Sequence, residues 1–192
     1  MIGAARRLAF RAIAAVAPRV VVVVIALGVF PACGPAVVDH TPAGNMLDAD
    51  TQSLEGGLGH WHAWFSTDIG RSSDNPHRGE ASLRITVTAP DGWGVELDNW
   101  PGFPATPGNH HIDLWTRAAS GSALDLAVSI RWRNDAGADL QTDGLRTRPN
   151  ETWQPIGGDL TAPTGTTRAA LELTGSEAAP GDAVDVDEIF LL

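Results

Sequence analysis

The sequence predicts an all-β protein built as an antiparallel sandwich or barrel. Apolar residues alternate with polar ones along several short segments, which is the period-two pattern of a strand with one buried face. The chain has 21 glycines and 13 prolines, and between those segments they gather in clusters that would form turns. From Asn45 onward, no segment sustains the i, i+3, i+4, i+7 apolar spacing of an amphipathic helix. Short strands separated by such turns are typical of sandwiches and barrels.

Two segments show the alternation most clearly. In Ser82–Thr88 and in Ala123–Arg133, a large apolar residue recurs at every second position, so each segment has one apolar face. Shorter stretches with the same spacing predict further strands at Val95 and Leu97, Ile112 and Leu114, Ala169 to Leu173, and Val184 and Val186. The predicted turns are Ala89–Gly92, Pro101–Gly108, Ala162–Gly165 and Ala179–Gly181. No internal repeat or second domain is indicated within 45–192.

Residues 1–32 are predicted to be a signal peptide. Arginines precede an apolar run, Val20–Phe30, which ends at Pro31-Ala32-Cys33-Gly34. These eleven residues are too few for a helix that spans a bilayer, which takes ~20. Basic residues, a short apolar run and then a small residue are the pattern of a secretory signal.

The junction at Cys33 resembles the lipobox of bacterial lipoproteins, in which the cysteine becomes the acylated first residue of the mature protein. The resemblance implies lipidation of Cys33 and a domain held outside the cytoplasmic membrane by its lipid. Residues 33–44 contain two prolines and few charges, so they are interpreted as an extended tether. Plain secretion with cleavage nearby is the alternative.

Charge and cysteine content exclude several classes of function. The formal net charge is −10, and all 23 acidic residues follow Cys33, together with nine of the 13 arginines. An acidic domain of this kind is a poor partner for nucleic acid, because such binding depends on clustered basic residues. One cysteine cannot form an internal disulfide or a multi-thiolate zinc site. The length fits one domain of about 150 residues, and we expect a monomer.

The order of short motifs along 45–192 is more specific than the number of strands. The chain contains, in order, Asn45-Met46-Leu47, Leu54-Glu55-Gly56-Gly57, Trp61, Gly79–Leu83, Thr106-Pro107-Gly108, Leu114–Ala118 and Val184–Ile189. This series resembles the cenC-type carbohydrate-binding module, from the family 4/9/22 group of galactose-binding-like jelly rolls. The resemblance implies a two-sheet antiparallel jelly-roll sandwich over 45–192, with a glycan-binding cleft on the solvent face of one sheet.

The same resemblance implies a structural calcium ion that ties the first strand to the last. Glu55 matches the opening glutamate of the family, and Asp187 matches its closing aspartate. Main-chain carbonyls around Ser53 and Glu80 would complete the shell of six to eight oxygen ligands that calcium requires. The alternative is that Glu55 and Asp187 are solvated acids at strand edges.

Seven tryptophans and no tyrosine make tryptophan the main stacking platform for a sugar. Sugar rings present apolar faces that stack on flat aromatic rings, and their hydroxyls bind acids, amides and arginine. Trp132 alternates with apolar residues and is predicted to be core, and Trp61 and Trp153 are predicted to be core as well. The cleft candidates are polar residues on the polar faces of predicted strands, with the tryptophans on or beside those faces: Trp93, Glu96, Asp98, Trp100, Asp113, Trp115 and Arg131.

No catalytic motif accompanies these residues. His60 and His62, or His110 and His111, could be considered as zinc ligands, but the sequence has no His-Glu-x-x-His motif, Gly-x-Ser-x-Gly motif or phosphate-binding loop. The sequence therefore predicts a protein that is not an enzyme and binds a polysaccharide or a cell-envelope glycan, with a β-linked glucan or xylan chain as the expected ligand. The alternative is an envelope structural or protein-interaction lipoprotein that uses the jelly roll without binding sugar.

Overall fold

The computed structural model describes residues 42–90, 92–97 and 100–192, which form eleven strands and one short helix. The predicted signal peptide, Cys33 and nearly all of the tether lie outside the described residues. Within the described part of the chain, no helix is long and apolar enough to cross a membrane.

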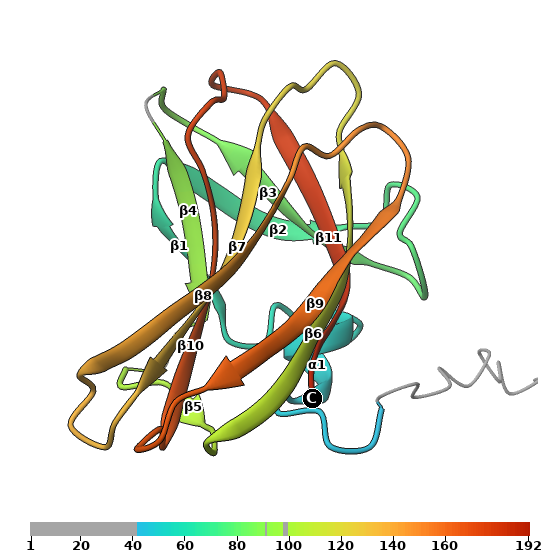
Figure 1. Cartoon of the computed structure of the whole chain (residues 1–192). Coiled ribbons are helices and arrows are strands. Elements are labelled where there is room, and N and C mark those ends of the chain that lie inside the picture. The colour runs from blue at the N-terminus through green and yellow to red at the C-terminus, as the bar shows by residue number, and fades with distance from the viewer. Residues whose placement is uncertain (1–41, 91, 98–99) are drawn as a thin grey trace, which may run out of the picture. The chain divides into compact units, whose positions relative to one another are not determined.

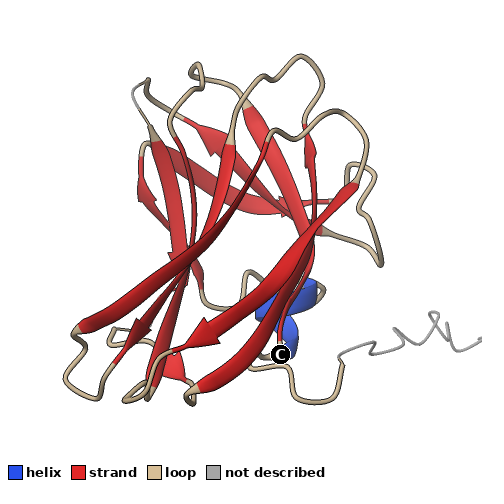
Figure 2. Ribbon diagram, in the orientation of Figure 1, coloured by secondary structure: helices blue, strands red, loops and turns tan. Residues whose placement is uncertain are grey.

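Two antiparallel sheets pack face to face (Figures 1 and 2). Sheet A consists, in spatial order, of β1 (Trp61–Phe65), β4 (Trp93–Leu97), β10 (Arg168–Gly175), β7 (Leu126–Arg133) and β8 (Asp139–Thr147), with β5 (Phe103–Pro104) paired to β10. Sheet B consists of β2 (Thr67–Ser72), β3 (Ser82–Val87), β11 (Ala183–Leu191), β6 (Gly108–Ala118) and β9 (Gln154–Ala162). The predicted all-β, two-sheet sandwich is confirmed.

The alternating residues of the sequence form the core between the sheets. From sheet A, Leu171 on β10 and Ile130 on β7 are inaccessible to solvent, and from sheet B so are Ile85 on β3 and Val186 on β11. Trp132 and Trp61 are buried as predicted, and the Trp132 indole N–H donates to Asp143 at 2.7 Å. Each sheet therefore turns one face inward and one outward.

A five-residue helix that the alternation pattern did not predict joins the two ends of the domain. Helix α1 (Ala49–Ser53) begins after Asp48, whose carboxylate accepts a hydrogen bond from the Thr51 N–H at 3.0 Å. The segment before it is tied to the last strand, because Met46 N–H donates to the Leu191 carbonyl at 2.8 Å and Leu191 N–H donates to the Asn45 side chain at 2.9 Å.

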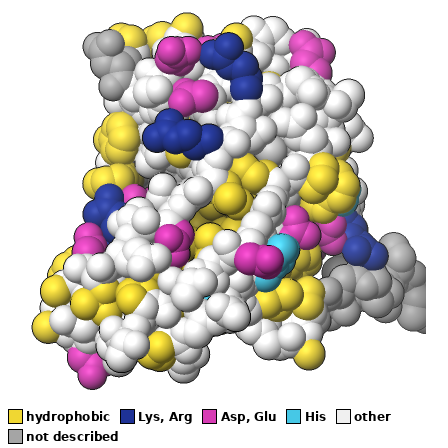
Figure 3. Space-filling model, in the orientation of Figure 1, with side chains coloured by type: hydrophobic (Ala, Val, Ile, Leu, Met, Phe, Trp, Pro, Cys, Tyr) yellow, Lys and Arg dark blue, Asp and Glu magenta, His cyan; other side chains and the backbone are white. Residues whose placement is uncertain are grey.

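The two outward faces differ in what lies over them. The outer face of sheet B, here called the covered face, lies in part under the segment 73–81: Trp115 on β6 stacks on His77, and Asp187 on β11 accepts from the Arg78 N–H. The outer face of sheet A, here called the open face, carries large exposed aromatic side chains. In the view of Figure 3, acidic and basic side chains are interspersed, and apolar side chains are visible between β8 and β9.

Candidate functional site

The floor of the open face is formed by β10 and β7. On β10 the alternation places Ala169, Leu171 and Leu173 in the core, so Ala170 and Glu172 point outward. Glu172 is only 4% exposed, although its strand face is an outer one. Side chains on the neighbouring strands, Arg131 among them, therefore cover Glu172.

Charged side chains cross this floor in register. Glu172 is paired across the sheet with Glu96 on β4, and Glu96 with His62 on β1. His62 Nε2 lies 3.1 Å from a carboxylate oxygen of Glu96. Arg131 on β7 binds Glu172 with two nitrogens, at 2.9 and 3.0 Å. Burial raises the pKa of the Glu172 carboxyl above its usual range, and the Arg131 guanidinium acts in the opposite direction.

Two aromatic side chains form one wall of the open face. Trp64 is 47% exposed, and it lies at a point where the pairing of β1 with β4 shifts by one residue. Phe65 follows it at an edge-on angle, with ring centroids 5.0 Å apart. Phe65 rests on Gly94, where an added Cβ would lie 2.5 Å from the ring. The Arg131 guanidinium carbon lies 6.0 Å from the Trp64 ring centroid, so the aromatic wall meets the charged floor.

Trp100 is a second aromatic platform at another end of the open face. It is 74% exposed, and the Arg133 guanidinium carbon lies 4.8 Å from its ring centroid. The turn between β7 and β8 supports the ring from the side, because a Cβ on Gly137 would lie 2.7 Å from it. Asp139 contacts both Arg133, at 2.6 Å, and Arg131, at 3.6 Å. The contacts therefore run without a break from Trp64 to Trp100.

This arrangement suits the chemistry of a sugar. Two exposed indole rings offer flat apolar platforms, and the floor between them offers fixed carboxylates and guanidinium groups for hydroxyls. Because the Arg131–Glu172 pair is bidentate, its groups are held in place before a ligand arrives.

Three of the seven predicted cleft residues, Glu96, Trp100 and Arg131, lie together on the open face. Asp113 and Trp115 do not join them. Both point outward from β6 in sheet B, so they lie on the covered face, and the prediction of one cleft for the whole set is wrong. The reason is that β6 and β4 belong to different sheets, whose outer faces point in opposite directions.

Trp93 also requires a correction, and Asp98 lies outside the described residues. Trp93 is completely buried because it alternates with Val95 and Leu97, which face the core. A buried ring cannot serve as a platform for a sugar. Trp153, predicted to be core, is instead half-buried over the covered face, where its indole N–H donates to the Asn75 carbonyl at 2.9 Å.

The open face also holds residues that the sequence did not predict for the site: Trp64, Phe65, His62, Glu172 and Arg133. Glu172 carried a usable signal, since it is the one acid between two core leucines in β10. Trp64 carried none, because the shift in pairing after Ala63 breaks the alternation that would assign its face.

The covered face is a network of satisfied charges. Asp185 is completely buried, and both of its oxygens are bound by Arg84, at 2.8 Å each. Arg117 adds two further hydrogen bonds to one of these oxygens, at 3.1 and 2.9 Å. Trp115 stacks on His77 with centroids 3.9 Å apart and an angle of 14° between the rings. These groups bind one another, so the covered face is interpreted as structural.

The carboxylates of Asp187 and Glu55, two of the predicted calcium ligands, accept hydrogen bonds from main-chain N–H groups. The Asp187 carboxylate is buried, accepts hydrogen bonds from main-chain N–H groups, and has no ion-pair partner among the described residues. Burial raises the pKa of its carboxyl to about 7. The Glu55 carboxylate likewise lacks a described cationic partner, and it accepts from the Glu80 N–H. Both acids therefore bind the segment 77–81, and the carboxylate of Asp187, unpaired among the described residues, is the one feature that would suit a calcium ion.

The side chains of Ser53 and Glu80, the other two predicted ligands, supply no further oxygen beside Glu55 and Asp187. The Ser53 hydroxyl donates to the Ala49 carbonyl at 2.8 Å, and Glu80 is exposed. Within the described ranges, no group of three or more His, Cys, Asp or Glu is placed to hold a metal. A calcium ion at Glu55 and Asp187 would therefore need main-chain carbonyls for the rest of its shell.

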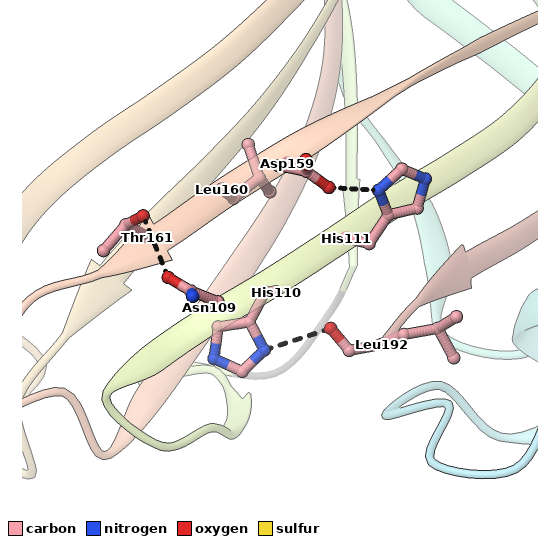
Figure 4. Close-up of a pocket in the computed structure, with 7 residues that line it drawn as sticks. All are labelled: Asn109, His110, His111, Asp159, Leu160, Thr161 and Leu192. Atoms are coloured by element: carbon pink, nitrogen blue, oxygen red, sulfur yellow. Dashed lines mark hydrogen bonds and ion pairs between the residues drawn. The ribbon is translucent and has the colours of Figure 1, made fainter.

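A polar pocket of about 460 Å³ lies where β6 and β9 pair near the last described residue (Figure 4). His111 Nδ1 lies 2.7 Å from a carboxylate oxygen of Asp159. His110 instead faces the carbonyls of Leu192, at 3.2 Å, and Thr106, at 2.8 Å. The two imidazoles point to different partners, so this pair does not form a shared zinc site.

Comparisons with known proteins agree with the geometry of the fold. No protein-family model matches the chain, and no curated protein matches it. Among solved structures, the CBM22-1 xylan-binding domain of Xyn10C from Paenibacillus barcinonensis is similar at a TM-score of 0.58, with 19% identity over 73% of this chain and 90% of that one. TmCBM61, solved with β-1,4-galactotriose, is similar at a TM-score of 0.54, with 15% identity over 77% of this chain and 97% of that one.

A third similar structure is the enzymatically active domain of bacteriophage CBA120 tailspike protein 4. Its TM-score is 0.59, with 14% identity over 77% of this chain and 21% of that one. The chain therefore has the jelly-roll sandwich fold that these modules share. Its candidate site rests on its own residues.

Proposed function

We propose that the domain binds a β-linked polysaccharide through the open face and does not cleave it. The observation that carries the proposal is the unbroken run of contacts from the exposed Trp64 through Arg131 and Arg133 to the exposed Trp100. The fold similarity supports it, because the similar modules include a xylan-binding domain and one solved with β-1,4-galactotriose. A chain of the xylan, glucan or galactan type is the proposed ligand.

The open face holds its acids in ways that suit binding. A glycosidase needs one carboxyl free to give a proton and another free to act as base or nucleophile. Here two of the three guanidinium nitrogens of Arg131 bind Glu172, and His62 binds Glu96. The carboxylates of Glu96 and Asp139, which stay partly exposed, are positioned as hydrogen-bond acceptors for sugar hydroxyls.

Calorimetric titration with soluble xylan, β-1,4-galactan and β-glucan tests the proposal. We expect binding of roughly −4 to −7 kcal/mol, from millimolar to ~10 µM. Trp64→Ala should weaken binding about tenfold, whereas Trp115→Ala, on the covered face, should leave it unchanged. An assay for new reducing ends on the same samples should stay flat. Release of reducing ends would contradict the non-catalytic function, and no binding of any glycan would favour the alternative of a protein-interaction lipoprotein.

The location of the protein is a separate part of the proposal. Cys33 follows a predicted signal peptide, so we propose a lipid anchor that holds the acidic domain outside the cytoplasmic membrane. Cys33→Ala should move the protein from the membrane fraction to the medium or to an uncleaved precursor. A Cys33→Ala protein that fractionates and migrates like the wild type would contradict the anchor.

A further inference from the structure

Arg168 on the open face carries a buried donor that has no partner among the described residues. Arg168 starts β10 on the same outward side as Glu172. Its Nε atom is buried without a hydrogen bond, and within the described ranges its guanidinium forms no ion pair. The neighbouring arginines of this face differ, because Arg131 binds Glu172 and Arg133 binds Asp139. The side chain is half-buried overall and only its Nε is fully enclosed, so its terminal nitrogens can still bind an acceptor from outside.

The surroundings of Arg168 concentrate positive charge beside a stacking platform. Its partner across the sheet is Arg133, which is itself buried and lies 4.8 Å from the Trp100 ring centroid. Among the described groups here, the guanidiniums of Arg131, Arg133 and Arg168 face two carboxylates, those of Glu172 and Asp139, so one guanidinium is in excess. This excess of positive charge occurs in a protein whose formal net charge is −10.

Resting on the proposed function, we propose that this end of the open face binds an acidic sugar. The Arg168 guanidinium receives the carboxylate of a uronic acid, and the sugar ring stacks on Trp100. Two guanidinium–carboxylate pairs already stand on this face, and the ligand supplies the carboxylate of a third. Guanidinium suits this role because its planar donors match the two oxygens of a carboxylate.

The test compares a polyuronate with its own neutral form. Oligomers of β-1,4-glucuronan and the same oligomers after chemical reduction of their carboxyl groups are titrated against wild type, Arg168→Gln and Arg146→Gln. Arg146 is the matched control, since it is an exposed arginine on β8, where its partner across the sheet is Ala127 at the other end of the face. A second pair, glucuronate-branched and unbranched xylan, shows whether the carboxylate lies on a branch or in the main chain. Melting curves verify that both variants are folded.

We expect the wild type to bind the acidic member of at least one pair about tenfold more tightly, the gain of one charge-assisted hydrogen bond. Added salt should reduce this preference. Arg168→Gln should remove it without changing affinity for the neutral polymer, and Arg146→Gln should retain it. Equal binding of acidic and neutral polymers by the wild type, or an unchanged preference in Arg168→Gln, would overturn the inference and leave the proposed function standing. Failure to bind any polymer would instead overturn the proposed function.

Discussion

The two outward faces of the sandwich carry similar residue types, but these residues are covered and paired on one face and exposed on the other. On the covered face, Trp115 stacks on a histidine, and the carboxylate of Asp185 is inaccessible between two arginines. On the open face, Trp64 and Trp100 stand in solvent above arginine–carboxylate pairs that remain partly accessible. The segment 73–81 contributes to this difference, because its His77 covers Trp115, whereas the rings of Trp64 and Trp100 stay exposed. An aromatic residue beside a charge therefore indicates a ligand only where the protein itself leaves the ring uncovered.

Loss of the central acid of the covered face should have the largest effect. Asp185→Asn leaves the guanidiniums of Arg84 and Arg117 without a full carboxylate partner in a buried place, and should lower the free energy of unfolding by about 3–5 kcal/mol. Asp139→Asn on the open face should cost less than about 1 kcal/mol, because Asp139 is half exposed. Urea denaturation of both variants measures the difference. Equal free energies of unfolding for Asp185→Asn and Asp139→Asn would contradict the distinction between a structural face and an open one.

The second prediction concerns Asp187 and calcium. Without the ion, the folded state keeps the Asp187 proton up to pH about 7, whereas the unfolded chain loses it near its usual pKa of 3.8. This group therefore contributes stability that is complete at low pH and is lost as the pH rises through 7. In chelator, the melting temperature should fall between pH 5 and pH 8, by about 5 °C more in wild type than in Asp187→Asn.

Added calcium should reverse this trend, because the ion binds the ionised carboxylate. The melting temperature of wild type at pH 8 should then rise with calcium, and that of Asp187→Asn should not. If calcium and chelator give the same melting curve for wild type, Asp187 is a buried acid and no calcium ligand.

Trp115→Ala provides a smaller test of the covered face. Removing a half-buried ring that stacks on His77 should cost about 1–2 kcal/mol of stability, while the affinity for glycan stays the same. Thermal melts and glycan titrations on one preparation measure both quantities. If Trp115→Ala loses affinity for glycan while its stability is unchanged, the glycan binds on the covered face and the assignment to the open face is wrong.

The smallest expected effect belongs to Asp113. It is half-buried on the covered face, so Asp113→Ala should change glycan affinity by less than about twofold, with a stability change within about 0.5 kcal/mol. Glu96→Ala, the corresponding change on the open face, should weaken binding measurably. A loss of affinity in Asp113→Ala equal to that in Glu96→Ala would contradict the division of the predicted site between two faces.

Most of the fold could be predicted because burial imposes a period of two on its central strands. Ser82–Val87 and Leu126–Arg133 form strands close to the predicted bounds. The strand Asp139–Thr147 could not be found in this way, since it lies at the edge of sheet A and most of its residues are exposed. Helix α1 depends on a local cap and on contact with β11, which alternation does not encode.

The site was less predictable for a related reason. Alternation shows that Glu96 and Asp113 both point away from the core, but it does not say which sheet each strand joins. It equally gives no sign that 73–81 lies over one outer face. Trp93 is a different case, since its spacing from Val95 and Leu97 already placed it on the apolar side.

The most direct test of the open face as the glycan site is NMR of the tryptophan side chains. Each of the seven indole N–H groups gives its own signal, which can be assigned by single substitution to phenylalanine. On titration with xylan or β-1,4-galactan oligosaccharides, the signals of Trp64 and Trp100 should shift in proportion to binding, and those of Trp115 and Trp153 should stay in place. Shifts at Trp115 and Trp153, with Trp64 and Trp100 unmoved, would contradict the account.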